Sequence, residues 1–274
     1  MSEKKKERLL VIDVGNTNIT CGVFDGEEIS ATFRLMTGET HTSDEYGVLL
    51  RDLLQFNQIF PDTLHGVIVA SVVPKVMHAL MNAIIKYIGK EPYIVGPGIK
   101  TGLKITSDNP KEIGPDLIVD CVAASELYGM PVLAVDFGTA TTYILVNDKG
   151  ELCAGAITPG IRISAKALWE DTARLPEIEI KKPESILGRN TVDTMQAGLV
   201  YGQIGQSKYI ISEMKRESGY ADLKVVATGG LGRMISEEVA EIDVYDPQLT
   251  LKGLKIIYEK NRHSKPRGRE SETE

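Results

Sequence analysis

Residues 9–18 read Leu-Leu-Val-Ile-Asp-Val-Gly-Asn-Thr-Asn, and residues 132–142 read Val-Leu-Ala-Val-Asp-Phe-Gly-Thr-Ala-Thr-Thr. Each stretch is an apolar run followed by Asp-x-Gly and then by Asn or Thr, so that Asp13 and Asp136 occupy matching positions. A second apolar run and a polar turn follow each copy. This pattern predicts a strand, a tight turn and a second strand. The chain is therefore predicted to consist of two related halves that each carry an acidic, glycine-containing turn.

The rest of each half predicts an α/β fold. After three hairpin-linked strands, the first half alternates amphipathic helices with short apolar strands, in the order β-β-β-α-β-α-β. Thr42 and Glu45 have the spacing of a capping box, which predicts a helix over 43–56. This order indicates a mixed sheet with helices on its faces. We expect a flexible arm at 1–7, two domains at 8–115 and 116–261, and a disordered tail at 262–274.

Further elements follow from apolar spacing and from Pro and Gly at segment ends. The predicted helices cover 74–88, 117–128, 163–173, 191–218 and 248–260. The predicted strands include 66–71, 92–96, 224–228 and 241–245, and the predicted loops are 99–110 and 154–160.

The composition favours a packed protein that binds neither nucleic acid nor membrane. Of the 274 residues, 42% are hydrophobic, and the net charge of −7 argues against binding to nucleic-acid phosphates. The apolar runs are too short to span a membrane. Cys21, Cys121 and Cys153 are scattered without metal-ligand spacing, which is typical of buried, reduced thiols. We therefore expect a cytoplasmic protein.

An Asp-x-Gly turn of this kind can contribute to phosphate binding. Its backbone N–H groups and hydroxyls can contact phosphate oxygens, and its aspartate can hold a cation that bridges to phosphate. Two facing turns would form a cleft for a nucleoside triphosphate, and phosphoryl transfer requires mostly positioning and charge neutralisation. A single Asp-x-Gly is common in surface hairpins, so the prediction depends on the second copy. The chain lacks the Gly-x-x-x-x-Gly-Lys-Ser/Thr sequence of P-loop enzymes.

Two other features each allow two interpretations. The glycine turn Thr228–Gly232 fits either a close approach of the backbone to an adenosine or an ordinary strand-to-helix turn. Asp116, which follows Gly-Pro, fits either a helix cap or a general base that takes a proton from a substrate hydroxyl. Asp120, one helical turn later, either shares that face or is a solvated helix position.

A series of short motifs occurs along the chain: Asp13–Asn18, Lys100–Leu103, Asp108–Pro110, Gly114–Asp116, Asp136–Thr142, Gly155–Gly160, Asn190–Thr191, Met195–Gly198 and Thr228–Gly230. Together they resemble the type III pantothenate kinases, members of the superfamily that contains acetate kinase, sugar kinases, Hsp70 and actin. The resemblance extends over about residues 8–260. It implies two related ribonuclease-H-like, actin-like domains with a nucleotide cleft between them.

The resemblance implies transfer of the γ-phosphate of ATP to the 4′-hydroxyl of pantothenate, the first step of coenzyme A synthesis. It implies ATP with Mg²⁺, and a monovalent cation, K⁺ or NH₄⁺, held by Asp136. Asp116 is implied as the catalytic base. The implied acceptor contacts are Gly114, Pro115, Asp116, Leu117 and Thr191, and the implied ATP contacts are Asp13, Val14, Gly15, Asn16, Thr17, Asn18, Ile19, Thr20, Thr139, Gly229 and Gly230.

Gly198, Gly202 and Gly205 form a row of small residues on one predicted helix. Such a row predicts close helix packing, either inside the subunit or across a dimer. Members of the family that the chain resembles are homodimers with the substrate pocket near the interface. The resemblance therefore favours packing across a dimer.

Three positions depart from the family pattern, and two of them, Leu117 and Ser107, affect the acceptor side. Leu117 stands where the family usually has Arg, so a guanidinium that could bind the pantothenate carboxylate is replaced by an apolar side chain. Ser107 replaces a Tyr, and Asp120 replaces an Asn. The phosphate-binding turns are intact. The alternatives to a pantothenate kinase are a nucleotide-binding regulator or degenerate paralogue on the same fold, and a kinase for another small hydroxyl acceptor.

Overall fold

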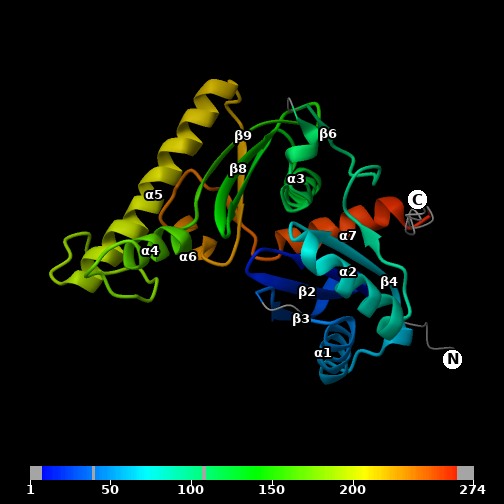
Figure 1. Cartoon of the computed structure of the whole chain (residues 1–274). Coiled ribbons are helices and arrows are strands. Elements are labelled where there is room, and N and C mark those ends of the chain that lie inside the picture. The colour runs from blue at the N-terminus through cyan, green and yellow to red at the C-terminus, as the bar shows by residue number, and fades with distance from the viewer. Residues whose placement is uncertain (1–7, 39–40, 107–108, 264–274) are drawn as a thin grey trace. The chain divides into compact units, whose positions relative to one another are not determined.

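The computed structural model describes residues 8–38, 41–106 and 109–263, and these divide into two compact units (Figure 1). Unit 1 comprises the described parts of 1–101, 111–122 and 250–274, and unit 2 comprises those of 102–110 and 123–249. Each unit is built around one β-sheet. The predicted arm at 1–7, the part of the predicted tail after residue 263, and Ser107 lie outside the described residues.

The sheet of unit 1 has a buried strand, β1 (Arg8–Val14), in the middle. In spatial order the sheet consists of β3 (Glu28–Met36), β2 (Asn18–Asp25), β1, β4 (Leu64–Ser71) and β5 (Tyr93–Ile94). β1 pairs antiparallel with β2 and parallel with β4. Because both faces of β1 are covered, Leu9 to Ile12 are buried almost completely. The run of apolar residues before Asp13 is therefore the centre of this sheet.

Two helical segments of unit 1, 43–56 and 74–88, begin and end where the sequence predicts. α1 (Ser43–Phe56) starts with the predicted capping box, in which Thr42 and Glu45 each accept a hydrogen bond from the other's backbone N–H. α2 (Pro74–Ala83) continues as one π-helical segment, Ile84–Ile88, and ends at Gly89, whose φ of +71° suits glycine. The remaining elements are the 3-10 turns Pro61–Thr63 and Pro110–Glu112, α3 (Pro115–Tyr128), whose first half lies in unit 1, and α7 (Leu249–Asn261).

Helix α7 makes the division of the chain differ from the predicted one. A Cβ atom on Gly22 would lie 3.0 Å from the Leu251 side chain, and the Tyr258 ring occupies the space beside Gly66. Two glycines of the first sheet thus make room for a helix from the far end of the chain. The segments that were predicted in the second half and that the structure groups with unit 1 are 116–122 and 250–261.

The sheet of unit 2 repeats the strand order of unit 1 and adds one strand. It consists of β11 (Val244–Tyr245), β10 (Lys224–Thr228), β7 (Val132–Phe137), β8 (Ala140–Val146), β9 (Glu151–Pro159) and β6 (Lys104–Ile105). β7 again pairs antiparallel with the next strand and parallel with the following one. The order β9-β8-β7-β10-β11 corresponds to β3-β2-β1-β4-β5. The predicted fold of two related α/β halves is confirmed.

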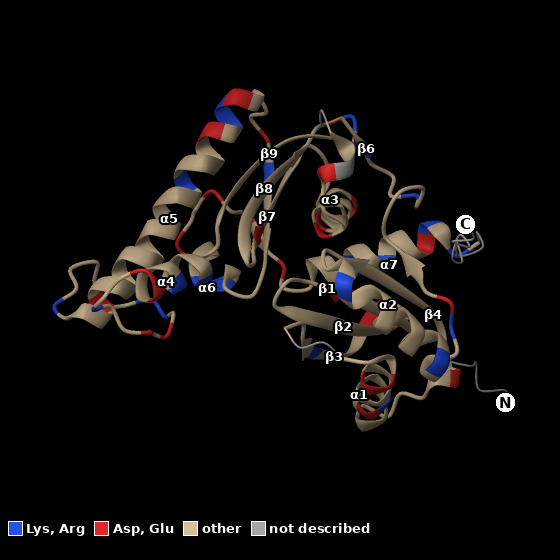
Figure 2. Ribbon diagram, in the orientation of Figure 1, with Lys and Arg blue, Asp and Glu red and all other residues tan. Residues whose placement is uncertain are grey.

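The helices of unit 2 are α4 (Ile161–Glu170), α5 (Thr191–Ser218) and the short α6 (Gly232–Ser236). The long helix α5 begins at Asn190, whose side chain accepts the Asp193 N–H, and ends at Gly219. Its buried apolar residues pack into the hydrophobic core of unit 2. Residues 194–207 of this helix carry no charged side chain, and Figure 2 shows its Lys and Arg residues in the C-terminal half.

Two predicted loops are wrong. Residues 154–160 were predicted as a loop, but β9 continues through Pro159 because Gly155 leaves room for the side chain of Ile144 on the neighbouring strand, 2.7 Å from where a Cβ would lie. The predicted loop 99–110 contains β6, which pairs parallel with β9. The other predicted helices and strands are present, with ends that differ by a few residues.

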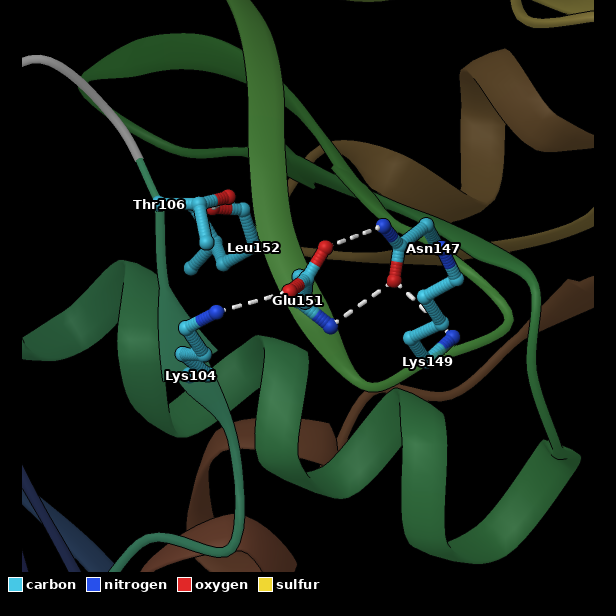
Figure 3. Close-up of polar contacts among 6 residues, drawn as sticks. All are labelled: Lys104, Thr106, Asn147, Lys149, Glu151 and Leu152. Carbon is cyan, nitrogen blue, oxygen red and sulfur yellow. Dashed lines mark hydrogen bonds and ion pairs between the residues drawn. The ribbon is translucent and has the colours of Figure 1, made fainter.

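Strand β6 is attached to unit 2 by a small polar network (Figure 3). Lys104 Nζ lies 2.9 Å from Glu151 Oε1, and Asn147 Nδ2 donates to Glu151 Oε2 at 3.0 Å. These two hydrogen bonds, the one from Asn147 first, hold the pKa of Glu151 below its usual value. The Thr106 N–H also donates to Leu152 O at 3.0 Å. The network fixes the segment that precedes residues 107 and 108.

Two expectations drawn from composition have different outcomes. Cys21 and Cys121 are buried as predicted, whereas Cys153 is exposed, so the prediction was wrong for this thiol. Across residues 8–38, 41–106 and 109–263, no helix has the length and apolar character needed to cross a membrane.

Candidate functional site

The first acidic turn joins β1 to β2 in unit 1. The Gly15 N–H donates to Asn18 O at 3.0 Å, which closes the turn. Thr37, which is 2% exposed, donates its hydroxyl to Gly15 O at 2.8 Å and its N–H to Thr17 O at 3.1 Å. The turn is thus fixed from behind, while Asn16, Thr17 and Asn18 are exposed. The side chains of these three residues are therefore accessible to a ligand, and hydrogen bonds fix the backbone that carries them.

The second acidic turn joins β7 to β8 in unit 2 and is one residue shorter than the first. The Gly138 N–H donates to Ala140 O at 3.1 Å, and the Gly160 N–H donates to Thr139 O at 3.2 Å. A Cβ atom on Gly160 would overlap the carbonyl oxygens of Gly138 and Thr139. The Pro-Gly at the end of β9 therefore allows its backbone to approach the turn closely.

The carboxylate of Asp136 lies in a cradle lined by two glycines. A Cβ on Gly138 would lie 2.8 Å from one carboxylate oxygen, and a Cβ on Gly229 would lie 2.5 Å from the other. Gly229 has a φ of +97°, which L-residues rarely adopt. Because β7 and β10 pair parallel with Asp136 opposite Thr228, the Asp-x-Gly turn and the Thr228–Gly230 turn meet here. The sequence identified both turns but not that they form one site.

The side chain that lies against both glycines is the carboxylate of Asp136. Among the residues that the structure describes, no group of three or more His, Cys, Asp or Glu side chains could hold a metal ion. The described residues therefore offer no zinc-type ligand set at Asp136.

Asp116 lies in the first turn of α3, in unit 1. Its Oδ1 accepts the Leu117 N–H at 2.9 Å, and a Cβ on Gly114 would overlap the carboxylate. Burial raises the pKa of Asp116, and hydrogen bonds from the backbone N–H groups of Leu117 and of Asp116 itself oppose this shift. Asp116 is thus a partly desolvated carboxylate whose position requires glycine at 114. These are properties of a proton acceptor as well as of a helix-terminal residue.

Asp120 is buried, so its interpretation as a solvated helix position is wrong. It is 4% exposed, and it accepts a hydrogen bond of 2.6 Å from the hydroxyl of Thr250. Thr250 lies at the start of α7, so this bond joins α7 to α3 one turn after Asp116. Asp120 therefore holds two helices of unit 1 together and does not share a solvent-facing surface with Asp116.

Unit 2 contains an open pocket of about 790 Å³ where the chain enters α5. Its walls come from α4, from the irregular segment before α5 and from residues 191–199 of α5, and they include Thr191. Of these lining residues, the resemblance implied an acceptor contact only for Thr191, and the segment 171–190 has no periodic pattern that would mark it. The lining residues are Ser164, Leu168, Leu175, Gly188, Arg189, Asn190, Thr191, Thr194, Met195, Gly198 and Leu199.

The irregular wall of this pocket is held in place by side chains of α5. Gln196, which is 3% exposed, donates to Glu179 O at 2.9 Å, and the Tyr201 hydroxyl donates to Pro183 O at 3.1 Å. Within the segment, Ile178 packs into the core of unit 2. The wall is therefore a fixed part of the unit although it has no regular secondary structure.

The glycine row of α5 does not pack within the described chain. A Cβ added to Gly198, Gly202 or Gly205 would meet no described atom within 4 Å, and all three are exposed. The interpretation of close packing inside the subunit is therefore wrong for the described residues.

Solved structures share this fold. A Baf family protein from Campylobacter jejuni aligns over 93% of this chain and 99% of its own length, with a TM-score of 0.57 and 20% identity. The ethanolamine utilization protein EutJ from Carboxydothermus hydrogenoformans aligns over 91% and 89%, with a TM-score of 0.51 and 17% identity. At these identities the likeness concerns the fold alone. Together with the repeated sheet order and the two acidic turns, it defines an actin-like α/β protein.

Sequence relatives define the family within this class. The model of the type III pantothenate kinases matches residues 9–213. A type III pantothenate kinase from Agathobacter rectalis is 61% identical over 252 residues, which are 92% of this chain and 97% of the relative. The chain belongs to the type III pantothenate kinase family, as its motifs predicted.

Proposed function

We propose that this protein transfers the γ-phosphoryl group of ATP to the 4′-hydroxyl of pantothenate, the first step of coenzyme A biosynthesis. The observation that carries the proposal is the 61% identity to a type III pantothenate kinase over almost the whole of both chains. The partly buried carboxylate of Asp116 supports it, because the reaction must remove a proton from a hydroxyl.

On the donor side, the first acidic turn is proposed to bind the phosphates of ATP. Its exposed Asn and Thr side chains and its held backbone supply donors for phosphate oxygens. Kinases of this kind use ATP with Mg²⁺, which neutralises charge on the phosphates when bound. The proposed ATP contacts are Asp13, Val14, Gly15, Asn16, Thr17, Asn18, Ile19, Thr20, Thr139, Gly229 and Gly230.

On the acceptor side, Asp116 is proposed as the general base. It accepts the proton of the 4′-hydroxyl while that oxygen bonds to the γ-phosphorus and the bond to ADP breaks. The raised pKa makes the ionised Asp116 a stronger proton acceptor than an exposed carboxylate. Thr191 is proposed to contact pantothenate from the pocket of unit 2. Gly114, Pro115 and Leu117 complete the proposed acceptor contacts.

Asp136 is proposed to hold a monovalent cation, K⁺ or NH₄⁺. The glycine-lined cradle supports this role, since it leaves both carboxylate oxygens close to backbone atoms of two turns. The cation would supply positive charge beside the phosphates. The chain is also proposed to act in the cytoplasm as a homodimer, and the unpacked glycine row of α5 supports an interface between subunits on that helix.

A direct test measures ADP formation by the purified full chain with ATP and Mg²⁺, with and without pantothenate. The proposal predicts ADP release that depends on pantothenate and is faster in K⁺ than in Na⁺. ATP binding without pantothenate-dependent ADP release in either salt would instead support a nucleotide-binding regulator. Release with other small alcohols, and none with pantothenate, would support a different acceptor.

Asp136→Asn should remove the stimulation by K⁺. Loss of a charged contact costs roughly 1.5–3 kcal/mol, so the rate in K⁺ should fall by about 10- to 100-fold to the level seen in Na⁺. The measurement is the initial rate at several K⁺ concentrations. Asp222→Asn, which changes an exposed carboxylate of the same unit, is the matched control and should behave as the wild type. A K⁺ response that survives in Asp136→Asn would assign the cation to other ligands.

A further inference from the structure

The proposed acceptor presents a chemical requirement that the site described so far does not meet. Pantothenate carries a carboxylate at neutral pH, and a site that selects it over a neutral alcohol needs a cation or several N–H donors. Leu117, beside the proposed base, is apolar and supplies no charge. The inference that follows rests on the proposed function, because it concerns how the same acceptor is held.

The pocket of unit 2 contains one charged side chain among its lining residues, the guanidinium of Arg189. The rest of the lining is apolar or carries hydroxyl and amide groups, and no acidic side chain is present among the lining residues. Among the described residues, the hydrogen bonds and ion pairs do not include Arg189, so its five N–H donors are available to a ligand.

The backbone that carries Arg189 is fixed against the first turn of α5. Asn190 caps the helix by accepting the Asp193 N–H at 2.9 Å, and the Thr194 hydroxyl donates to Asn190 O at 2.8 Å. A Cβ on Gly188 would lie 2.5 Å from the Thr194 nitrogen, so the residue before Arg189 is packed closely as well. The positive end of the helix dipole adds to the attraction for an anion at this position.

We infer that Arg189 is a specificity-determining residue that binds the carboxylate of the acceptor in the pocket of unit 2. The apolar side chains of Leu168, Leu175 and Leu199 provide contact surface for the aliphatic part of the acceptor. Arg189 is exposed, so solvent and salt screen its attraction, and the gain in affinity is that of a partly exposed pair.

The test compares binding of pantothenate with binding of pantothenol, in which a CH₂OH group replaces the carboxylate. Arg189→Gln should raise the Kd for pantothenate by roughly 2- to 5-fold, and Arg189→Lys should restore part of that loss. The Kd for pantothenol should stay the same in all variants. Arg174→Gln is the matched control, because Arg174 is exposed in the same irregular segment but does not line the pocket.

Calorimetry gives each Kd, and the fluorescence of Trp169 gives a second measurement. Trp169 is the single tryptophan of the chain, and its neighbour Leu168 lines the pocket. The affinity of the wild type for pantothenate should also fall as salt is raised, and this dependence should weaken in Arg189→Gln.

Three results would overturn the inference: an unchanged Kd for pantothenate in Arg189→Gln, an equal loss for both ligands, or no binding of pantothenate by the wild type. Turnover distinguishes this failure from failure of the proposed function. A wild type that binds pantothenate through Arg189 but forms no ADP with it keeps the inference and contradicts the kinase. If the protein forms ADP with pantothenate but Arg189→Gln leaves the Kd for pantothenate unchanged, the kinase is kept and the inference is contradicted.

Discussion

Asp116→Asn should lower kcat for pantothenate phosphorylation by about 10²- to 10⁴-fold, the usual contribution of a general base. The variant keeps the shape of the side chain, and its Oδ1 can still accept the Leu117 N–H. ATP binding should therefore be unchanged. The measurement is steady-state kcat together with the Kd for ATP. Asp52→Asn, in an exposed position on α1, is the matched control and should keep full activity.

The same substitution should not destabilise the protein. Burial raises the pKa of Asp116 in the folded state, so this group favours folding below its unfolded pKa and loses that contribution as pH rises through the folded pKa. At pH 7 to 8 the ionised carboxylate therefore lowers the free energy of unfolding, and the neutral Asn side chain does not. Thermal unfolding at pH 8 should show an equal or higher Tm for Asp116→Asn than for the wild type.

The pH profile gives a further check on Asp116. The wild-type rate should rise with pH as the carboxylate with the raised pKa ionises, and the residual rate of Asp116→Asn should not show that rise. A variant with normal kcat would remove Asp116 as the base. A large fall in Tm would mean that the residue is needed for the fold instead.

Gly229→Ala should have the second large effect, through the cradle of Asp136. The new methyl group would lie 2.5 Å from the Asp136 carboxylate and 2.6 Å from the backbone of Phe137, at a φ of +97°. A positive φ alone costs a non-glycine residue about 1–2 kcal/mol, and the overlap adds to it. We expect the free energy of unfolding to fall by at least about 2 kcal/mol and the K⁺-stimulated rate to fall by roughly 100-fold or more.

The neighbouring glycine provides the control for stability. A Cβ on Gly230 would meet no described atom within 4 Å, so Gly230→Ala should change the free energy of unfolding by less than about 0.5 kcal/mol. Chemical denaturation of both variants measures the difference. Equal stability of the two variants would contradict the close packing of Gly229 against Asp136.

The parts of the fold that sequence could predict are those set by local patterns. Asp13 and Asp136 each end an apolar run and lie two positions before a glycine. The structure places each near the end of the central strand of its sheet, and the two central strands occupy corresponding places in the strand order. The capping box of Thr42 likewise involves residues three positions apart. Turns, caps and strand alternation depend on neighbours in the chain, so one sequence suffices to predict them.

The parts that sequence did not predict depend on distant residues. Nothing near α7 in the sequence shows that Leu251 and Tyr258 pack against glycines of the first sheet, so the units of the structure differ from the predicted halves there. The meeting of Asp136 with Gly229 depends on the parallel pairing of β7 with β10. The pocket wall that carries Arg189 has no periodic pattern in its sequence. Hydrogen bonds from Gln196 and Tyr201, which lie on a later helix, hold it in place.

The proposed reaction is tested most directly by identifying its product. The purified full chain is incubated with ATP, Mg²⁺, K⁺ and pantothenate, and the mixture is analysed by mass spectrometry and by phosphorus–proton correlation NMR. The proposal predicts pantothenate that has gained one phosphoryl group, with the phosphorus coupled to the protons next to the 4′-oxygen, and no such product from Asp116→Asn. Unmodified pantothenate after incubation with a folded, ATP-binding wild type would contradict it.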